Sequence, residues 1–416
     1  MKSATLLGID AVEATVTVDL TNKLPACVLV GLPSAVVRET VDRVCAAIRA
    51  SGFMMPRKRV MIEVGPADLA KHSSAHYDLP IALAILAASK QIPAKRLDGV
   101  AAFGELALDG AVRPVRGAIA LAAACGDGDI LVPCDNAAEA ALESGAVYGV
   151  RSLSEAAGRS GQGPTPHPSV RSVGYNIDWS EVRGQDQAKR MLEVAAAGGH
   201  NILLISSPGC GKTMLAARLP TILPPMDDAT ARQVTRIHSV AGLLRPGEGL
   251  VTRRPFRAPH HTVSAAGMIG NARLMPGEMT LAHAGVLMLD ELPEFQRSVI
   301  EVMRRPVQTG EVELVRAAGA VRLPANCIIV AAANPCPCGW LGHPTRPCMC
   351  SEAIVARYMA RCNDLAHNLN IDIVVRVMPM GPPDLLLPDG ESSETVRARV
   401  QTARDAQGLG SGYSPK

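Results

Sequence analysis

The sequence from 206 to 213 is Ser206-Ser207-Pro208-Gly209-Cys210-Gly211-Lys212-Thr213. This glycine-rich stretch follows the apolar run 201–205, which predicts a strand, and precedes a helix-like segment at 214–219. A glycine-rich turn from a strand into a helix exposes backbone N–H groups that bind phosphate oxygens. The lysine of such a loop reaches the β- and γ-phosphates, and its threonine hydroxyl binds Mg²⁺. The stretch therefore predicts an ATP site formed by Ser207 and the residues after it, up to Met214.

One position departs from the phosphate-loop pattern Gly-x-x-x-x-Gly-Lys-Ser/Thr, because Ser206 stands where the first glycine is expected. The alternative interpretation is an ordinary glycine turn between a strand and a helix. A second motif favours the ATP site, since the apolar run 286–289 ends in Asp290 and Glu291. At the edge of a parallel sheet, Asp290 would hold Mg²⁺ and Glu291 would polarise the attacking water.

A third apolar run, at 327–333, ends in Asn334. Alone, this asparagine would be interpreted as a turn residue. Together with the two motifs above, it is interpreted as a polar residue that positions the attacking water. The predicted catalytic residues are therefore Lys212, Glu291 and Asn334, and the predicted Mg²⁺ ligands are Thr213 and Asp290.

The overall composition limits the class of protein. With 416 residues the chain is long enough for two or three domains. Its 42 basic and 39 acidic residues give a formal charge of +3, which neither demands nor excludes nucleic acid. The longest apolar run, at 79–89, is too short to span a bilayer, and no signal peptide is recognisable. Because 11 cysteines fit a reducing compartment better than a disulfide framework, we expect a cytoplasmic protein without membrane contact.

The predicted fold class is α/β, in two domains. Residues 1–158 combine β-branched, strand-like runs with helical patterns, and no obvious catalytic cluster lies among them. The Pro/Gly-rich stretch 159–175 is expected to be a linker. The ATP site would then belong to a second domain at 176–380, followed by a polar helix-like segment and a Gly/Ser-rich tail at 381–416.

Several longer segments match a known family. They include Gly31-Leu32-Pro33, Pro66-Ala67-Asp68-Leu69, Gly104-Glu105-Leu106, Arg254-Pro255-Phe256-Arg257-Ala258-Pro259-His260-His261, Leu289-Asp290-Glu291-Leu292-Pro293-Glu294-Phe295 and Asn334-Pro335-Cys336-Pro337-Cys338-Gly339. Through these segments the chain resembles the YifB/ComM family of magnesium-chelatase-like proteins over most of its length. The resemblance implies a Lon-protease-like α/β domain followed by a P-loop AAA+ αβα domain with a parallel sheet. It also implies hexameric rings and, for the ComM members, DNA branch migration.

Lon-type proteolysis needs a serine and a lysine in contact. In the alignment that the resemblance implies, the serine falls near His76 or Tyr77 and the lysine falls on Ile119. Ser73 and Ser74 lie close by, but no base is evident that could activate them. The first domain is therefore predicted to be non-proteolytic.

Two basic segments are candidates for DNA contact. One is the segment 253–261, which contains Arg253, Arg254 and Arg257. The other is a predicted hairpin at 311–323, where Arg316 could meet phosphates in a salt-dependent, sequence-independent way. The alternative is that these arginines are simply solvated or form pairs at a subunit interface.

Four cysteines, Cys336, Cys338, Cys348 and Cys350, follow the spacing C-x-C-x₉-C-x-C. Four thiolates could close a tetrahedral Zn²⁺ site and tie down the loop between them, with His343 as a spare ligand. Free reduced cysteines and a redox pair are the alternatives.

The sequence leaves the family pattern near its end. Family members carry an arginine, interpreted as a finger toward a neighbour's nucleotide, where this chain has Asn370. Finger arginines contribute about 10³–10⁵ in rate, and Arg357 or Arg361 could substitute only from outside the motif. Because the chain ends at Lys416, the helical lid of AAA+ proteins is also expected to be largely missing.

The predicted function is that of an ATP-binding, DNA-remodelling ring ATPase of the ComM type, acting as a homo-hexamer with impaired hydrolysis. One alternative is a magnesium-chelatase-type ATPase subunit, which the Lon-like domain disfavours. The other is a nucleotide-gated regulatory or assembly module without turnover.

Overall fold

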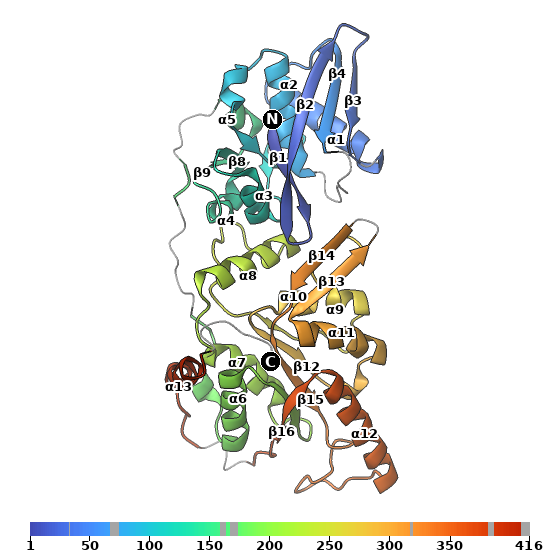
Figure 1. Cartoon of the computed structure of the whole chain (residues 1–416), viewed down its shortest axis with the longest axis vertical. Helices are drawn as coiled ribbons and strands as arrows, with labels where there is room; N and C mark the ends of the chain where they lie inside the picture. The colour runs from blue at the N-terminus through green and yellow to red at the C-terminus, as the bar shows by residue number, and fades with distance from the viewer. Residues whose placement is uncertain are drawn as a thin grey trace.

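The computed structural model describes residues 1–32, 34–66, 75–158, 164–166, 174–316, 319–381 and 387–408. Two α/β units, each built around its own sheet, follow one another along the molecule (Figure 1). Most of the expected linker, together with Ser73 and Ser74 and the tail beyond 408, lies outside the described residues. None of the helices in the described part of the chain has the length and apolar character needed to cross a bilayer.

The first unit contains a seven-stranded mixed sheet. Its strands, in order across the sheet, are β3 (Ala26–Val30), β4 (Arg59–Gly65), β2 (Asp10–Thr21), β1 (Lys2–Leu7), β5 (Ala101–Ala102), β8 (Asp129–Pro133) and β9 (Ala146–Val150). Its helices are α1 (Ser34–Ala50), α2 (Asp78–Ala88), α3 (Ala118–Cys125), α4 (Ala137–Ala140) and α5 (Leu153–Gly158), and β6 (Glu105–Leu106) pairs with β7 (Val112–Arg113). In β4, Val60, Ile62 and Val64 alternate along the strand and are all buried, as expected for a strand with one face on the core.

The second unit contains a five-stranded parallel sheet. Its order is β11 (Phe256–Arg257), β12 (Val286–Leu289), β15 (Ile328–Ala333), β10 (Asn201–Ile205) and β16 (Ile371–Arg376). All residues of β10, β12 and β15 are buried. Continuous apolar strands of this kind are typical of parallel sheets covered by helices on both faces, so the predicted α/β fold class is confirmed.

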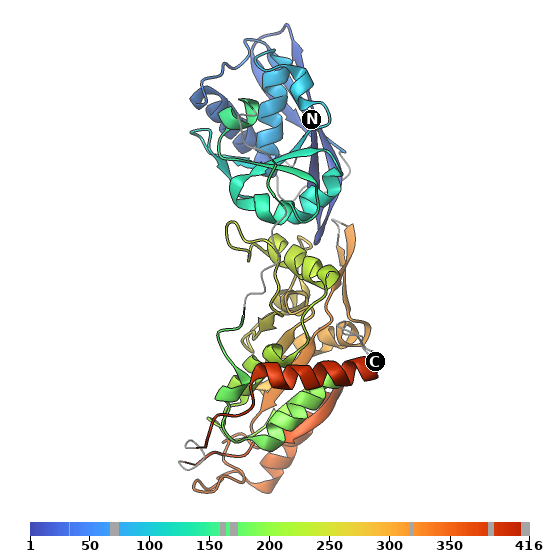
Figure 2. The same ribbon diagram turned by 90° about the vertical axis from the view of Figure 1, so that its left-hand side faces the viewer.

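Helices cover both faces of this sheet. On one face lie α8 (Asp228–Ala241), α9 (Ala265–Ile269), α10 (Glu278–Leu281), α11 (Arg297–Thr309) and α12 (Glu352–Asn368). On the other lie α6 (Asp186–Gly198), α7 (Lys212–Ile222) and α13 (Ser393–Ala406). Short 3₁₀ helices occur at η1 (Ala75–Tyr77), η2 (Ala94–Leu97), η3 (Cys134–Asn136), η4 (Trp179–Glu181) and η5 (Leu292–Glu294). The polar helix-like segment near the end is thus α13, which packs beside α6 and α7 (Figure 2).

The two units touch through a hairpin of the second unit, β13 (Glu311–Arg316) and β14 (Gly319–Pro324), and through α8. Ile9, in the turn between β1 and β2, belongs to the apolar core of the second unit. A Cβ atom added to Gly8 would lie 3.3 Å from side-chain atoms of Leu323 and Val321, so the turn and β14 are in direct contact. The predicted hairpin is therefore present and packs on the first unit, while the Arg316 side chain lies outside the described residues.

Candidate nucleotide-binding site

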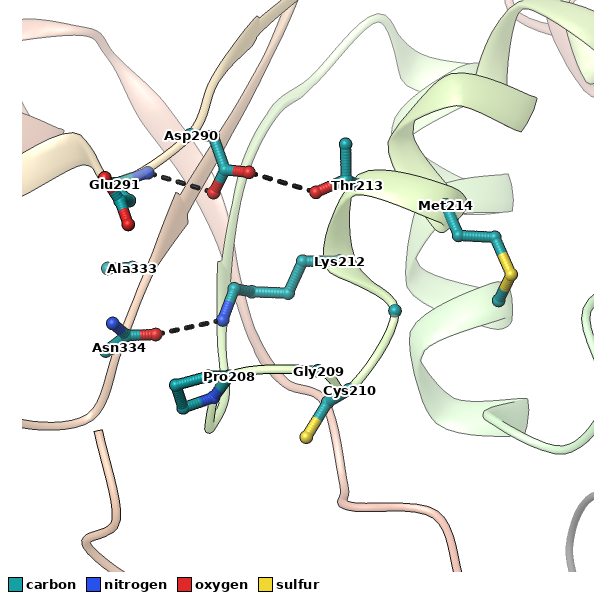
Figure 3. A pocket seen from close by; sticks show the side chains of 11 residues that line it. Pro208, Gly209, Cys210, Lys212, Thr213, Met214, Asp290, Glu291, Ala333 and Asn334 are labelled. Carbon is teal, nitrogen blue, oxygen red and sulfur yellow. Dashed lines mark hydrogen bonds between the residues drawn. The ribbon is translucent and has the colours of Figure 1, made fainter. Parts of the chain in front are cut away.

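A cavity of about 430 Å³ opens where the loop after β10 meets the carboxyl ends of β12 and β15 (Figure 3). Its lining residues are Pro208, Gly209, Cys210, Gly211, Lys212, Thr213, Met214, Asp290, Glu291, Ala333 and Asn334. Parallel strands end at one edge of their sheet, which brings these distant segments together. Ser207, also predicted for this site, does not line the cavity and is buried.

The loop has the backbone geometry that its glycines predict. Gly209 and Gly211 have φ angles of +80° and +87°, in the left-handed region that other residues rarely adopt. Ser206, at the departure from the pattern, is not in that region. Its N–H donates to the carbonyl of Ala333 at 3.2 Å and its hydroxyl to the carbonyl of Ser207 at 3.1 Å. A serine therefore replaces the first glycine without backbone strain.

The Lys212 ammonium group lies in the centre of the site. Its Nζ donates to the Ser206 carbonyl at 2.8 Å, to the Ser206 hydroxyl at 3.2 Å and to Asn334 Oδ1 at 3.2 Å. Burial lowers the pKa of Lys212, and the nearby carboxylate of Asp290 acts in the opposite direction. Because these partners are neutral oxygens, a phosphate oxygen in the cavity would be a stronger acceptor for the same ammonium group.

Thr213 and Asp290 meet across the cavity mouth. The Thr213 hydroxyl donates to Asp290 Oδ2 at 3.0 Å, and Asp290 Oδ1 accepts the N–H of Glu291 at 3.0 Å. Mg²⁺ prefers oxygen ligands, and adjacent ligands in an octahedral Mg²⁺ site lie about 2.9 Å apart. The hydroxyl and carboxylate oxygens of Thr213 and Asp290 therefore fit two neighbouring positions around Mg²⁺.

Glu291 stands at the mouth of the cavity with more than half of its side chain exposed. Its backbone is left-handed, with φ +54°, a conformation that costs energy for a residue with a side chain. Its Oε2 lies 3.3 Å from Nδ1 of His261. His261 was grouped by sequence with a basic segment, and nothing in the spacing of the chain pairs it with Glu291. The structure alone makes this contact visible.

Asn334 follows the last residue of β15, and its side-chain amide points toward the ammonium group of Lys212 (Figure 3). Its backbone also bonds to the hydroxyl of Tyr358 on α12, while burial raises the pKa of that hydroxyl to about 12. Because Asn334 Oδ1 lies 3.2 Å from Lys212 Nζ, the amide group borders the part of the cavity where the attacking water is expected.

The four predicted zinc ligands lie together beside this site. All four sulfur atoms are within 4.8 Å of one another, and the three distances among Cys336, Cys338 and Cys348 are 3.4–3.6 Å. Sulfur atoms around a tetrahedral Zn²⁺ ion are about 3.8 Å apart, whereas a disulfide bond is only about 2.05 Å long. The spacing suits four thiolates around one metal ion.

The arginines of the basic segment 253–257 serve mainly inside the fold. Arg254 is buried and donates to the carbonyls of Pro224 and Ala284, both at 2.6 Å. Arg257 makes a two-pronged ion pair with Glu278, at 2.7 and 2.8 Å. The buried guanidinium group of Arg254 cannot reach a phosphate, so the predicted DNA contact is wrong for Arg254. The guanidinium group of Arg257 already has a carboxylate partner within the fold.

Asn370 lies at the opposite edge of the sheet from the cavity. It precedes β16, which runs parallel to β10 with Ile371 opposite Asn201, whereas the phosphate loop follows the other end of β10. Its side chain is exposed, and its carbonyl accepts a hydrogen bond from Asn201 at 3.2 Å. Arg357 and Arg361 are exposed on α12. Position 370 therefore lies away from the nucleotide cavity of its own chain.

In the first unit, the residues that replace the serine and lysine of a Lon-type dyad are buried. His76 and Tyr77 lie in η1, Ile119 lies in α3, and all three are at most 3% exposed. Burial lowers the pKa of His76 to about 4, so its ring is neutral at neutral pH. These side chains are packed into the core of the unit.

The parallel sheet, the phosphate loop after β10 and the acidic pair after β12 define a P-loop protein of the AAA+ class. Two family models match the chain: "Magnesium chelatase, subunit ChlI" over residues 178–383 and "Subunit ChlI of Mg-chelatase" over residues 16–136. The chain belongs to the YifB/ComM family of magnesium-chelatase-like AAA+ ATPases.

Three relatives illustrate the membership. The chain is 41% identical to an uncharacterised protein of Mycobacterium tuberculosis, in a match that covers 97% of this chain and 82% of that protein. It is 40% identical to the uncharacterised protein YifB of Escherichia coli, over 96% of this chain and 80% of YifB. It is 38% identical to the competence protein ComM of Haemophilus influenzae, over 96% of this chain and 81% of ComM.

Proposed function

We propose that this chain binds ATP and Mg²⁺ in the cavity after β10 and acts as a DNA-remodelling ring protein with weak hydrolysis of its own. The observation that carries the nucleotide site is the meeting of Lys212, Thr213 and Asp290 in one cavity, with the Thr213 hydroxyl 3.0 Å from Asp290. The family membership supports ATP as the nucleotide and a homo-hexamer as the assembly.

Each residue of the site has a distinct role in this proposal. The backbone N–H groups from Ser207 to Met214 and the ammonium group of Lys212 bind the phosphates. Thr213 and Asp290 hold Mg²⁺, which when bound offsets negative charge on the phosphate oxygens. The Glu291 carboxylate accepts a proton from the attacking water, and Asn334 orients that water.

Weak hydrolysis follows from the residue at position 370. At the far edge of the sheet, Asn370 can serve only a neighbouring subunit, and an asparagine offers no positive charge to a transferring phosphoryl group. Finger arginines are worth about 10³–10⁵ in rate. The site would therefore hold ATP while turning it over slowly.

Contact with DNA is proposed at the hairpin β13–β14 and the adjoining end of α11. Arg305 and Arg322 each expose about three quarters of their side chains, and both approach the carboxylate of Glu313, at 2.9 and 3.8 Å. Arg304 is also exposed at this end of α11, so three guanidinium groups face the two exposed carboxylates of Glu311 and Glu313, and the surface keeps a net positive charge. Such a surface binds the phosphate backbone without reading sequence.

ATP turnover and salt-titrated DNA binding test this function together. We expect micromolar binding of Mg·ATP, turnover below about 1 s⁻¹ with single-stranded, duplex or forked DNA, and DNA affinity that falls steeply with salt. Faster turnover that disappears in Glu291→Gln would contradict impaired hydrolysis. Nucleotide binding without DNA binding would instead favour a chelatase-type subunit or a regulatory module.

We also propose that Cys336, Cys338, Cys348 and Cys350 hold one structural Zn²⁺ ion. The donor set is four thiolates at the separations described above, and tetrahedral thiolate sites of this kind are typical of structural zinc. Protein purified without chelators should contain close to one zinc per chain by atomic absorption. A content below about one ion per four chains would exclude the site.

A further inference from the structure

The cysteine loop, defined as residues 336–350, is in direct contact with the phosphate loop. It begins two positions after Asn334, and its Gly339 has a φ of +82°. A Cβ atom added to Gly339 would lie 2.8 Å from Cδ of Pro208 and 3.9 Å from Cγ of Asn334. The backbone of the cysteine loop therefore forms a wall behind two residues that line the nucleotide cavity.

The clustered sulfurs and Gly339 form one continuous piece of structure. The N–H of Gly339 donates to the carbonyl of Cys336 at 2.9 Å, which closes a turn around Pro337 and Cys338. The Cys338 sulfur accepts the backbone N–H groups of Trp340 and Met349. Backbone donors of this kind orient metal-bound thiolates, so the position of Gly339 depends on the geometry of the sulfur cluster.

We infer that the metal bound by the four cysteines controls the affinity of the nucleotide cavity, an inference that rests on the nucleotide and zinc sites proposed above. The backbone at Gly339 lies against Pro208, and Asn334 lies where Lys212 donates to it. An ion held by the four cysteines would fix this arrangement. Without the ion, the clustered sulfurs would have no common partner, and the cysteine loop would move away from the phosphate loop. Pro208 and Asn334 then lose their support, and ordering them becomes part of the cost of binding nucleotide.

The first experiment compares the zinc-loaded protein with protein stripped by a chelator and with the double variant Cys348→Ser, Cys350→Ser. Affinity for a fluorescent ATP analogue is measured with Mg²⁺ present, and zinc content is measured on the same samples. We expect the affinity to fall about tenfold without zinc and to return when zinc is added to the stripped protein. Cys134→Ser, which lies in the first unit, should retain both zinc and affinity.

A second pair of variants tests the contact itself without touching a cysteine. Gly339→Ala places a methyl group against Pro208 and should lower nucleotide affinity about tenfold while zinc content stays unchanged. Gly342→Ala is the matched control, because Gly342 has a similar φ of +78° in the same loop but no atom within 4 Å of an added Cβ. Gly342→Ala should therefore leave both readouts near those of the wild type.

The outcomes separate the two levels of the proposal. If the stripped protein and Gly339→Ala bind the ATP analogue as tightly as the zinc-loaded wild type, the control by zinc is excluded and the nucleotide site stands. If the zinc-loaded wild type binds no nucleotide, the proposed function fails and the coupling fails with it. If Gly342→Ala weakens binding as much as Gly339→Ala, the effect comes from backbone strain and the contact with Pro208 carries no coupling.

Discussion

Replacing Lys212 with alanine is expected to weaken binding of Mg·ATP about 100-fold, or roughly 2.7 kcal/mol. Lys212 is the one cationic side chain among the described residues that line the cavity, where Asp290 and Glu291 contribute negative charge. Without the ammonium group, the charged side chains left among the described lining residues are the carboxylates of Asp290 and Glu291, which repel triphosphate. The loss should therefore be seen in binding itself, by calorimetry or by titration with a fluorescent analogue.

The control for this prediction is Lys95→Ala, which removes an exposed lysine of the first unit. It changes the net charge by the same amount and should leave affinity within about twofold, because screened charges far from a site contribute little. If Lys212→Ala keeps its affinity within about fivefold of the wild type, the cavity is not the nucleotide site.

Replacing Phe295 with alanine is expected to destabilise the second unit by about 3–5 kcal/mol. Phe295 is fully buried in the core between the sheet and its helices, directly after η5. Its ring also packs edge-on against His261, with 6.5 Å between ring centres, so it supports the partner of Glu291. The truncation leaves a cavity that the surrounding helices can close only in part. The Tm of the unfolding transition of this unit should fall by about 10 °C.

Phe53→Ala serves as the comparison, since Phe53 is only half-buried at the margin of the other core. Phe53→Ala should lower stability clearly less than Phe295→Ala, because less apolar surface returns to water. A shift below about 2 °C for Phe295→Ala would show that the region around η5 tolerates the cavity, against the packing described here.

Much of the candidate site could be predicted because its residues belong to short local sequence motifs. Lys212 and Thr213 follow a glycine-rich turn, Asp290 and Glu291 directly follow one apolar strand, and Asn334 directly follows another. The edge of a parallel sheet then brings all of them together. Arg254 and Arg257 show the limit of such reasoning. Their partners are the carbonyl groups of Pro224 and Ala284 and the carboxylate of Glu278, which no local pattern connects with them.

The sequence by itself determined the α/β class, the phosphate loop, the acidic pair after β12 and the candidate zinc ligands. Each of these can be recognised from a short local pattern of residues. Only the tertiary structure decided that His261 faces Glu291 and that Gly339 lies against Pro208. These relations depend on backbone angles and on contacts between segments far apart in the chain. Such contacts depend on how helices and strands pack together, to within a few ångströms. The spacing of residues along the sequence does not reveal them.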